Sequence, residues 1–224
     1  MCGRYTLTTN KVKIAEEFHL HDVQLRELPP QYNIAPSQPV PVLLEKPELS
    51  LELFRWGLIP SWAKDPSIGN KMINARSETL SSKASFSKPL RERRCLILAD
   101  GFYEWKQEGR TKAPYYVRLK SKQPFGFAGL WSKWVAPVGN PIYSCTIITG
   151  EPNELLKPIH NRMPVILLRE KRDEWLDPSN HDTNGLMKLL EPYPPSEMEA
   201  YPVSRLVNSP ENNQPECMEP VPVS

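Results

Sequence analysis

Four short stretches of the sequence carry side chains that could take part in chemistry. The first is the opening Met1-Cys2-Gly3-Arg4. Removal of Met1 would leave Cys2 with both a free α-amine and a thiol. Their ordinary pKa values, about 8 and about 8.5, make both groups partly nucleophilic near neutral pH. The alternative is that Cys2 has no chemical role, since the ends of a chain often take no part in function.

The second stretch is NARSET, residues 74–79, within a long polar segment that we expect to be a loop. The Asn74 amide and the Arg76 guanidinium are two residues apart, so both can point at one oxyanion or phosphate. The alternative interpretation is an Asx turn followed by a solvated arginine.

The third stretch is DGFYEWK, residues 100–106, at the end of an apolar segment. Glu104 lies between Tyr103 and Trp105, at what we expect to be the end of a strand. Shielding from water would raise the pKa of this carboxyl toward the range that is useful for proton transfer. The alternative is a solvent-facing glutamate on an edge strand.

The fourth stretch is IHNRMP, residues 159–164. His160 lies between Ile159 and Arg162, just before an expected strand, and the other three histidines are expected at the surface. His160 is therefore the best candidate for a general acid or base, although a single histidine often has only a structural role.

Together these motifs resemble the SOS-response-associated peptidase (SRAP) family. The resemblance rests on the MCGR start, NARSET, DGFYEWK, the H-x-R-x-P of residues 160–164 and the late PVS..VN of residues 202–208. The segments QYNIAPSQ, RWGLIPSW and FSKPL extend it over roughly residues 1–210. It implies the SRAP fold.

The resemblance also implies a DNA-repair activity. Family members recognise abasic sites in single-stranded DNA and bond covalently to the ring-opened deoxyribose aldehyde. They are also described as thiol autopeptidases that release residue 1, with a link to SOS mutagenesis operons. By matching position, cleavage between Met1 and Cys2 frees the nucleophile Cys2, Asn74 orients it, and Glu104 and His160 form the acid–base pair. The expected DNA contacts are Arg4, Trp62, Arg76, Phe86, Trp105 and Arg162.

The chemistry of an N-terminal cysteine agrees with this implication. An α-amine and an aldehyde give an imine, and the neighbouring thiol then closes a five-membered thiazolidine. An internal cysteine has no free amine and cannot do this. Because both nucleophiles belong to one residue, the second attack is intramolecular, which removes a large entropic barrier. The expected activity is a lyase-like DNA–protein crosslinking that shields the lesion.

Three other functions remain open at this point. A class II glutamine amidotransferase also has a cysteine directly after the initiator Met, although no matching glutamine-binding motif follows here. A reader of single-stranded or modified DNA would use the same surface without chemistry. A peptidase acting on other proteins is the third. Removal of Met1 by a methionine aminopeptidase is also an alternative to autocatalysis.

The composition indicates the architecture that must position these stretches. The chain has 224 residues with 25 prolines and only 10 glycines, a balance that favours short strands and rigid loops over long helices. We expect a single α+β domain with a curved, mostly antiparallel and barrel-like β core and peripheral helices, spanning residues 1–210. An acidic, proline-rich C-terminal tail would follow at residues 211–224.

Hydrophobic periodicity predicts the individual elements. We expect a helix at residues 10–19, a hairpin at 40–45 and 49–56, a long irregular segment at 57–80, and a helix at 87–94 capped by Ser87. Strands are expected at 95–105, 114–120, 125–131, 142–149 and 164–168. Further helices are expected at 153–157, 169–176 and 182–190, and the chain after residue 191 is expected to be extended, and disordered near its end.

The distribution of charge and the positions of the cysteines limit which partners and cofactors we expect. The net charge is +2, but residues 191–224 carry six glutamates and one arginine, so the first 190 residues carry +7. A basic body suits a polyanionic partner. Cys95 and Cys145 are expected to be buried and inert, and no metal or organic cofactor is implied. We expect a cytoplasmic monomer, without membrane contact, that associates with the nucleoid when bound to DNA, and the replication machinery is a candidate partner.

Overall fold

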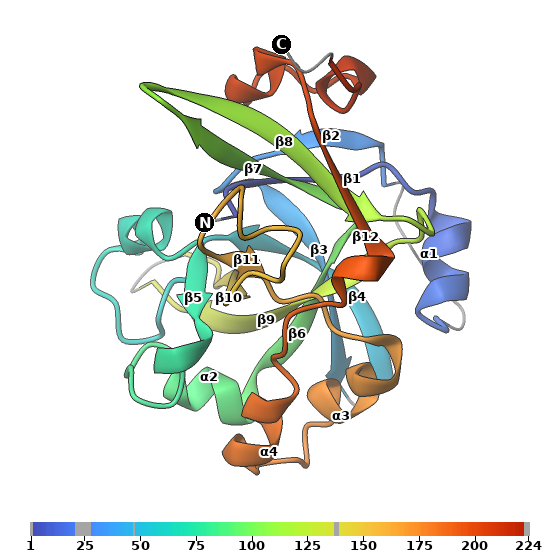
Figure 1. The fold of residues 1–224 in the computed structure, drawn as a ribbon. Helices are drawn as coiled ribbons and strands as arrows, with labels where there is room; N and C mark the ends of the chain where they lie inside the picture. The colour runs from blue at the N-terminus through green and yellow to red at the C-terminus, as the bar shows by residue number, and fades with distance from the viewer. Residues whose placement is uncertain (1, 21–27, 47, 137–138, 222–224) are drawn as a thin grey trace.

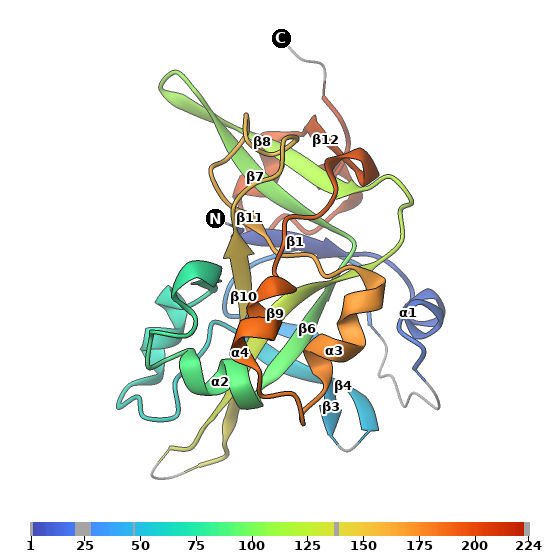
Figure 2. The same ribbon diagram turned by 60° about the horizontal axis from the view of Figure 1, so that its bottom comes forward.

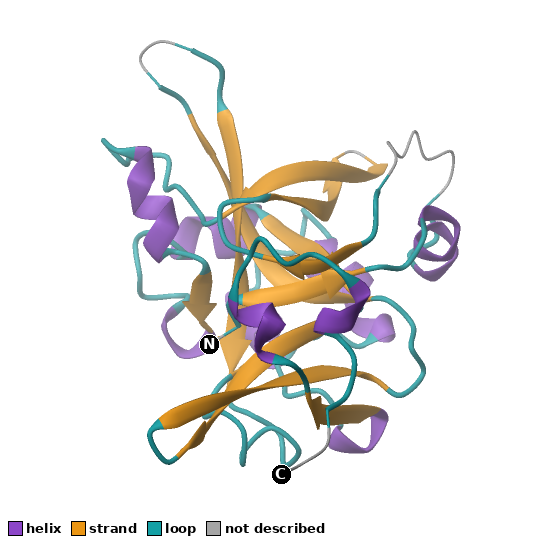
Figure 3. Cartoon of the chain, turned by 90° about the horizontal axis from the view of Figure 1, so that it is seen from above, coloured by secondary structure: helices purple, strands orange, loops and turns teal. Residues whose placement is uncertain are grey.

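Two β-sheets packed against each other form the centre of the molecule (Figure 1). The computed structural model describes residues 2–20, 28–46, 48–136 and 139–221. The helices lie outside the sheets (Figure 3), and α2, α3 and α4 gather at one end of the molecule (Figures 1 and 2). Within the described residues, no helix is long and apolar enough to cross a membrane.

The first sheet closes on itself as a five-stranded barrel. The strands follow the order β10-β4-β3-β6-β9, and β9 pairs with β10 to complete the ring. Only β4 and β10 run parallel within this ring. The predicted curved, mostly antiparallel β core is therefore confirmed. The barrel strands are β3 (Pro39–Lys46), β4 (Glu48–Trp56), β6 (Arg94–Ala99), β9 (Phe125–Trp134) and β10 (Ile142–Gly150).

The second sheet has five antiparallel strands in the order β12-β8-β7-β1-β2. The fully buried ring of Tyr5 joins it to the barrel by packing edge-on against Trp56 and Phe127, with ring centroids 5.2 and 5.7 Å apart. The strands are β1 (Arg4–Leu7), β2 (Gln31–Ile34), β7 (Gly101–Glu108), β8 (Thr111–Leu119) and β12 (Met198–Pro202).

Two short strands bring separate motifs to the same end of β10. Strand β5 (Asn74–Arg76) pairs parallel to β10, and β11 (Met163–Pro164) pairs antiparallel to it. The NARSET motif therefore begins in a strand, and the prediction that all of it is loop was wrong. Pairing with β10 buries Ala75 and leaves Asn74 and Arg76 on the opposite face.

The helices are short. The prediction of a helix near residues 10–19 is confirmed, with the Asn10 side chain accepting from the Lys13 backbone amide at 3.0 Å. The α-helices are α1 (Lys11–Glu17), α2 (Ser87–Glu92), α3 (Arg172–Leu176) and α4 (Thr183–Lys188). The 3-10 helices are η1 (Pro66–Lys71), η2 (Ser77–Thr79), η3 (Arg169–Lys171), η4 (Pro195–Glu197), η5 (Arg205–Asn208) and η6 (Pro215–Cys217).

The apolar segment 95–105 is two strands rather than one. The chain leaves the barrel at the end of β6, turns at Asp100, and enters the second sheet as β7. The buried Asp100 carboxylate accepts from the Thr6 hydroxyl at 2.5 Å and from the backbone amides of Thr8 and Thr9 at 2.6 and 2.8 Å. These bonds compensate the desolvation of the carboxylate and fix the corner. Glu104 consequently lies within β7, not at a strand end.

Other local predictions also need correction. Residues 153–157 form hydrogen-bonded turns capped by Asn153 instead of a helix. Ser87 is the first residue of α2, whose N-cap is Phe86 without a side-chain hydrogen bond. Of the predicted strand 164–168 only Pro164 lies in a strand, β11, and an isolated bridge follows at Ile166.

The acidic segment after residue 191 is folded through residue 221. It contains β12, three 3-10 helices and the fully buried Cys217, so the prediction of an extended segment was wrong there. Residues 222–224 lie outside the described residues. Cys95 and Cys145 are buried, as predicted, and so is Cys2.

The corner at Asp100 gives a first test. A methyl group at position 101 would overlap the hydroxyl and ring of Tyr116, which is 3% exposed and hydrogen-bonded to Thr6. We expect Gly101→Ala to lower the free energy of unfolding by about 2 kcal/mol or more, measured by urea denaturation.

Gly150→Ala is the matched control, because its new methyl group meets Val165 at an ordinary 3.5 Å. Equal stabilities of the two variants would contradict the close approach of Tyr116 to Gly101.

Candidate functional site

Cys2 lies two residues before the start of β1, and its side chain is fully buried. The Asn74 amide of β5 donates to the Cys2 carbonyl at 2.8 Å, so the β5 strand holds the backbone of this residue. Burial, followed by the charge of Glu104, raises the pKa of the Cys2 thiol well above its usual range. The thiol is therefore protonated at rest.

Glu104, in the interior of β7, lies close enough to Cys2 for its charge to affect the thiol. The β1–β7 register pairs Arg4 with Tyr103 and brings the start of β1 beside this carboxylate, which is 1% exposed. Burial raises the pKa of Glu104 to about 7, against the lowering effect of the positively charged amino terminus. The alternative of a solvent-facing Glu104 is excluded by this burial.

His160 completes the predicted acid–base pair. Its Nε2 lies 4.0 Å from Glu104 Oε2. The Nδ1 atom lies 3.0 Å from the Arg162 backbone nitrogen and 3.1 Å from the Arg162 carbonyl oxygen, so the backbone of Arg162 holds the ring with Nε2 toward Glu104. Burial lowers the pKa of His160, which keeps the imidazole neutral near pH 7.

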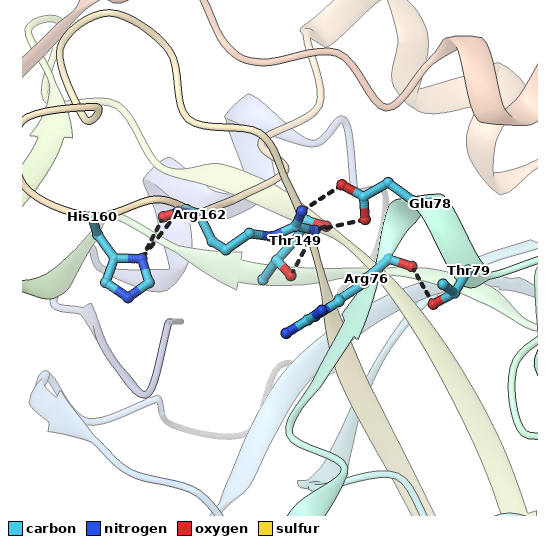
Figure 4. A network of polar contacts seen from close by, with 6 residues as sticks. All are labelled: Arg76, Glu78, Thr79, Thr149, His160 and Arg162. Atoms are coloured by element: carbon cyan, nitrogen blue, oxygen red, sulfur yellow. Dashed lines mark hydrogen bonds and ion pairs between the residues drawn. The ribbon is translucent and has the colours of Figure 1, made fainter.

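Two of the predicted DNA-contacting arginines lie next to this cluster (Figure 4). The mostly buried Arg162 makes a two-point ion pair with Glu78 and also donates to the Thr149 carbonyl. The Arg162 hydrogen bond holds the pKa of Glu78 below its ordinary value. Arg76 is exposed, and its side chain extends away from Glu78.

The remaining predicted contacts lie in different settings. Trp62 is 57% exposed on the loop before η1, and Trp105 is half-buried with its indole N–H donating to Asn208 Oδ1 at 2.8 Å. Phe86 is 5% exposed and belongs to the main core, so its ring does not fit the expected contact with a base. Arg4 is half-buried and bonded to protein carbonyls.

A cavity of about 540 Å³ opens beside Glu104 and His160. Four of the residues that line it were not predicted as site residues, and neither was Glu78; the four are Thr111, Lys112, Arg205 and Asn208. Lys112 belongs to the β7–β8 hairpin and Arg205 to the segment interpreted as an extended tail, so no local pattern pointed to them. The PVS..VN motif around Arg205 was the one available signal. The full lining is Glu104, Trp105, Thr111, Lys112, His160, Arg205 and Asn208.

Across the residues with described positions, no group of three or more histidine, cysteine, aspartate or glutamate side chains could hold a metal ion. The cluster itself offers several groups that can react or transfer protons. These are a buried thiol, a carboxyl that titrates near neutrality and a neutral imidazole, with cationic side chains beside them.

Known proteins resemble this chain over nearly its full length. The abasic site processing protein YoqW of Bacillus subtilis is 54% identical and covers 98% of this chain and 99% of its own. The abasic site processing protein HMCES of Gallus gallus is 34% identical over 99% of this chain and 78% of its own. A crystal structure of a protein from Bacteroides thetaiotaomicron superposes with a TM-score of 0.88 at 30% identity, covering 98% of this chain and all of that one.

A family model described as SOS response associated peptidase (SRAP) matches residues 1–210. With this match and the relatives above, the chain belongs to the SRAP family.

Proposed function

We propose that this protein processes abasic sites in single-stranded DNA by forming a thiazolidine with the sugar aldehyde through Cys2, after removal of Met1. The observation that carries the proposal is the convergence of Cys2, Asn74, Glu104 and His160 from four separate segments. The relatives named abasic site processing proteins support it.

The protonation states favour attack by the amine first. Because the Cys2 thiol is held protonated, the neutral α-amine adds to the aldehyde carbon and gives a carbinolamine. Loss of one water leaves an imine, and the thiol then adds to the imine carbon while its proton passes to nitrogen. The product carries both the nitrogen and the sulfur of Cys2 on the former aldehyde carbon.

Glu104 and His160 are suited to the proton transfers in this sequence. A carboxyl with a pKa of about 7 can take a proton from the incoming amine and return it to the leaving hydroxyl at neutral pH. The Nε2 atom of His160 can exchange a proton with a sugar oxygen held at the cavity. Among the described residues Asn74 Oδ1 has no hydrogen-bond partner, so it can accept from the amine or from a sugar hydroxyl.

The burial of the reacting groups supports a single-stranded substrate. A sugar in a duplex must be flipped out of the helix to reach a fully buried thiol, whereas an unpaired nucleotide can turn into the cavity without that cost. Arg76, Arg162, Lys112 and Arg205 would attract the phosphates on either side of the lesion. The exposed Trp62 and the half-buried Trp105 can stack on bases. The same proposal takes the protein to act as a monomer.

The central test is a denaturing gel. Mature protein mixed with single-stranded DNA carrying one abasic site should give a heat-stable shifted band, and Cys2→Ala should abolish it. Cys145→Ala is the matched control because it removes another buried thiol. Mass spectrometry of the purified protein should show that Met1 is absent.

Trapping at full yield by protein that still carries Met1 would contradict the proposed chemistry. Rapid glutamine hydrolysis by the mature protein would favour the amidotransferase instead. A protein–DNA complex that dissociates on heating in denaturant would indicate a non-covalent DNA reader.

The pH dependence tests Glu104. A base that titrates near 7 is ionised only above that pH, so the rate of adduct formation should rise as the pH passes through about 7. Glu104→Gln should lower the rate at pH 7.5 by about 100-fold or more. The adduct rate of Glu104→Gln should then depend on pH only through the titration of the α-amine, near pH 8. Single-turnover rates between about pH 5.5 and 8.5 measure both. A wild-type profile that is flat through pH 7 would remove Glu104 from the proton transfers.

Glu78 competes with DNA phosphates for Arg162 under this proposal. We expect Glu78→Gln to tighten binding to undamaged single-stranded DNA by about fivefold at low salt, or about 1 kcal/mol, because it frees Arg162 and removes one negative charge. The gain should vanish at high salt. Glu92→Gln makes the same charge change on α2, next to Lys88, and should have little effect. Weaker binding by Glu78→Gln would mean that the carboxylate mainly holds Arg162 in place.

A further inference from the structure

The segment after β12, residues 203–221, is built into the fold, and we call it the C-terminal segment. Val203, Val207 and Cys217 are buried in a second apolar cluster with Tyr103 of β7 and Tyr116 of β8. This cluster is separate from the main core. In Figure 1 the segment follows β12 along the second sheet and carries the last helical turns. Its packing shows that it is held firmly against β7 and β8.

The C-terminal segment supplies one wall of the candidate site. Arg205 and Asn208, at the two ends of η5, line the cavity beside Glu104 and His160. Asn208 Oδ1 accepts the indole N–H of Trp105 at 2.8 Å, which links this wall to β7. The position of η5 therefore affects the shape of the cavity next to the reacting groups.

Arg4 fastens η5 directly to the strand that carries the nucleophile. Its Nη1 donates to the Val207 carbonyl at 2.7 Å and to Asn33 Oδ1 at 3.0 Å, and its Nη2 donates to the Asn208 carbonyl at 3.2 Å. The two carbonyls belong to the last residues of η5, where backbone acceptors have no partner inside the helix. Both hydrogens of Nη1 are thus already used by neutral acceptors within the protein.

Asn33 of β2 strengthens the same attachment. The Asn33 side chain is 2% exposed, and its Nδ2 lies 3.2 Å from the Val207 carbonyl, 2.9 Å from that of Ser209 and 2.8 Å from that of Asn212. In return, the Asn213 side chain accepts from the backbone amides of Tyr32 and Asn33. Arg4 and Asn33 therefore act together on one turn of the C-terminal segment.

We propose that Arg4 is a positioning residue that holds η5 as a wall of the site, and that it is not the phosphate ligand which the family resemblance implied. The inference rests on the proposed function only in taking damaged DNA as the substrate. Arg4 stands two residues after Cys2 on the same chain, so one strand presents the nucleophile and fixes the wall opposite Glu104. Losing this contact should slow adduct formation without changing the number of phosphates bound.

Three variants separate positioning from phosphate binding. Arg4→Met removes the donors and keeps much of the aliphatic chain, Asn33→Ala breaks the same attachment without any change in charge, and Arg76→Met removes an exposed cation beside the site. For each, we would measure the salt dependence of the Kd for abasic single-stranded DNA and the adduct rate at saturating DNA. Hydrogen exchange of residues 205–213 in the DNA-free protein gives a readout that is independent of the chemistry.

We expect Arg4→Met and Asn33→Ala to behave alike. Both should speed exchange at residues 205–213 and lower the saturating adduct rate at least tenfold, with an unchanged slope of log Kd against log salt. Arg76→Met should instead reduce that slope by about 0.7, the value for one phosphate on a single strand, and leave exchange unchanged. Arg4→Lys, which retains one donor group, should recover part of the rate.

A reduced salt slope for Arg4→Met, with normal exchange, would overturn the inference and make Arg4 a phosphate ligand. Wild-type behaviour of Asn33→Ala in exchange and rate would also overturn it. If Arg4→Met does not fold, Arg4→Lys and Asn33→Ala carry the comparison. If wild-type protein forms no adduct, the proposed function fails, and exchange at residues 205–213 still decides whether Arg4 holds the segment.

Discussion

The hydrogen bonds of the buried Asp100 carboxylate determine how the two sheets meet. A carboxylate away from water is costly unless it is well bonded, and this one is satisfied by the Thr6 hydroxyl and by backbone amides just after β1. The end of β1 is therefore fixed at the corner between β6 and β7. With that end fixed, the β1–β7 register places Cys2 near Glu104. The position of Cys2, just before the start of β1, therefore depends on the Asp100 hydrogen bonds at the other end of β1.

The candidate site concentrates groups that do little for stability. Burial raises the pKa of both the Cys2 thiol and the Glu104 carboxyl, so the same dry surroundings disfavour the charged form of each. Such an arrangement is typical of functional sites, where residues are selected for chemistry rather than for folding. The ion pair between Glu78 and Arg162 has a related effect. The Glu78 carboxylate partly neutralises the Arg162 guanidinium, which would contact DNA under the proposed function.

Elements with a local signal could be predicted from the sequence, and those defined by distant partners could not. The β3–β4 hairpin was predicted from alternation, and α1 from its periodicity and the Asn10 cap. The break at Asp100 depends on threonines more than ninety positions earlier, which no local pattern shows. Motif resemblance identified Cys2, Asn74, Glu104 and His160, which the structure brings together. It could not show that Phe86 is buried in the core.

The bonds between Arg4 and η5 join residues that are made at very different times during translation. Arg4 leaves the ribosome early, whereas Val207 and Asn208 follow about two hundred residues later. A nascent chain that lacks residues 203–221 lacks one wall of the cavity beside Glu104, even though its Cys2 has already been synthesised. Completion of the cavity is thereby coupled to completion of the C-terminal segment, and under the proposed function truncated products would carry Cys2 without part of the enclosure around its target.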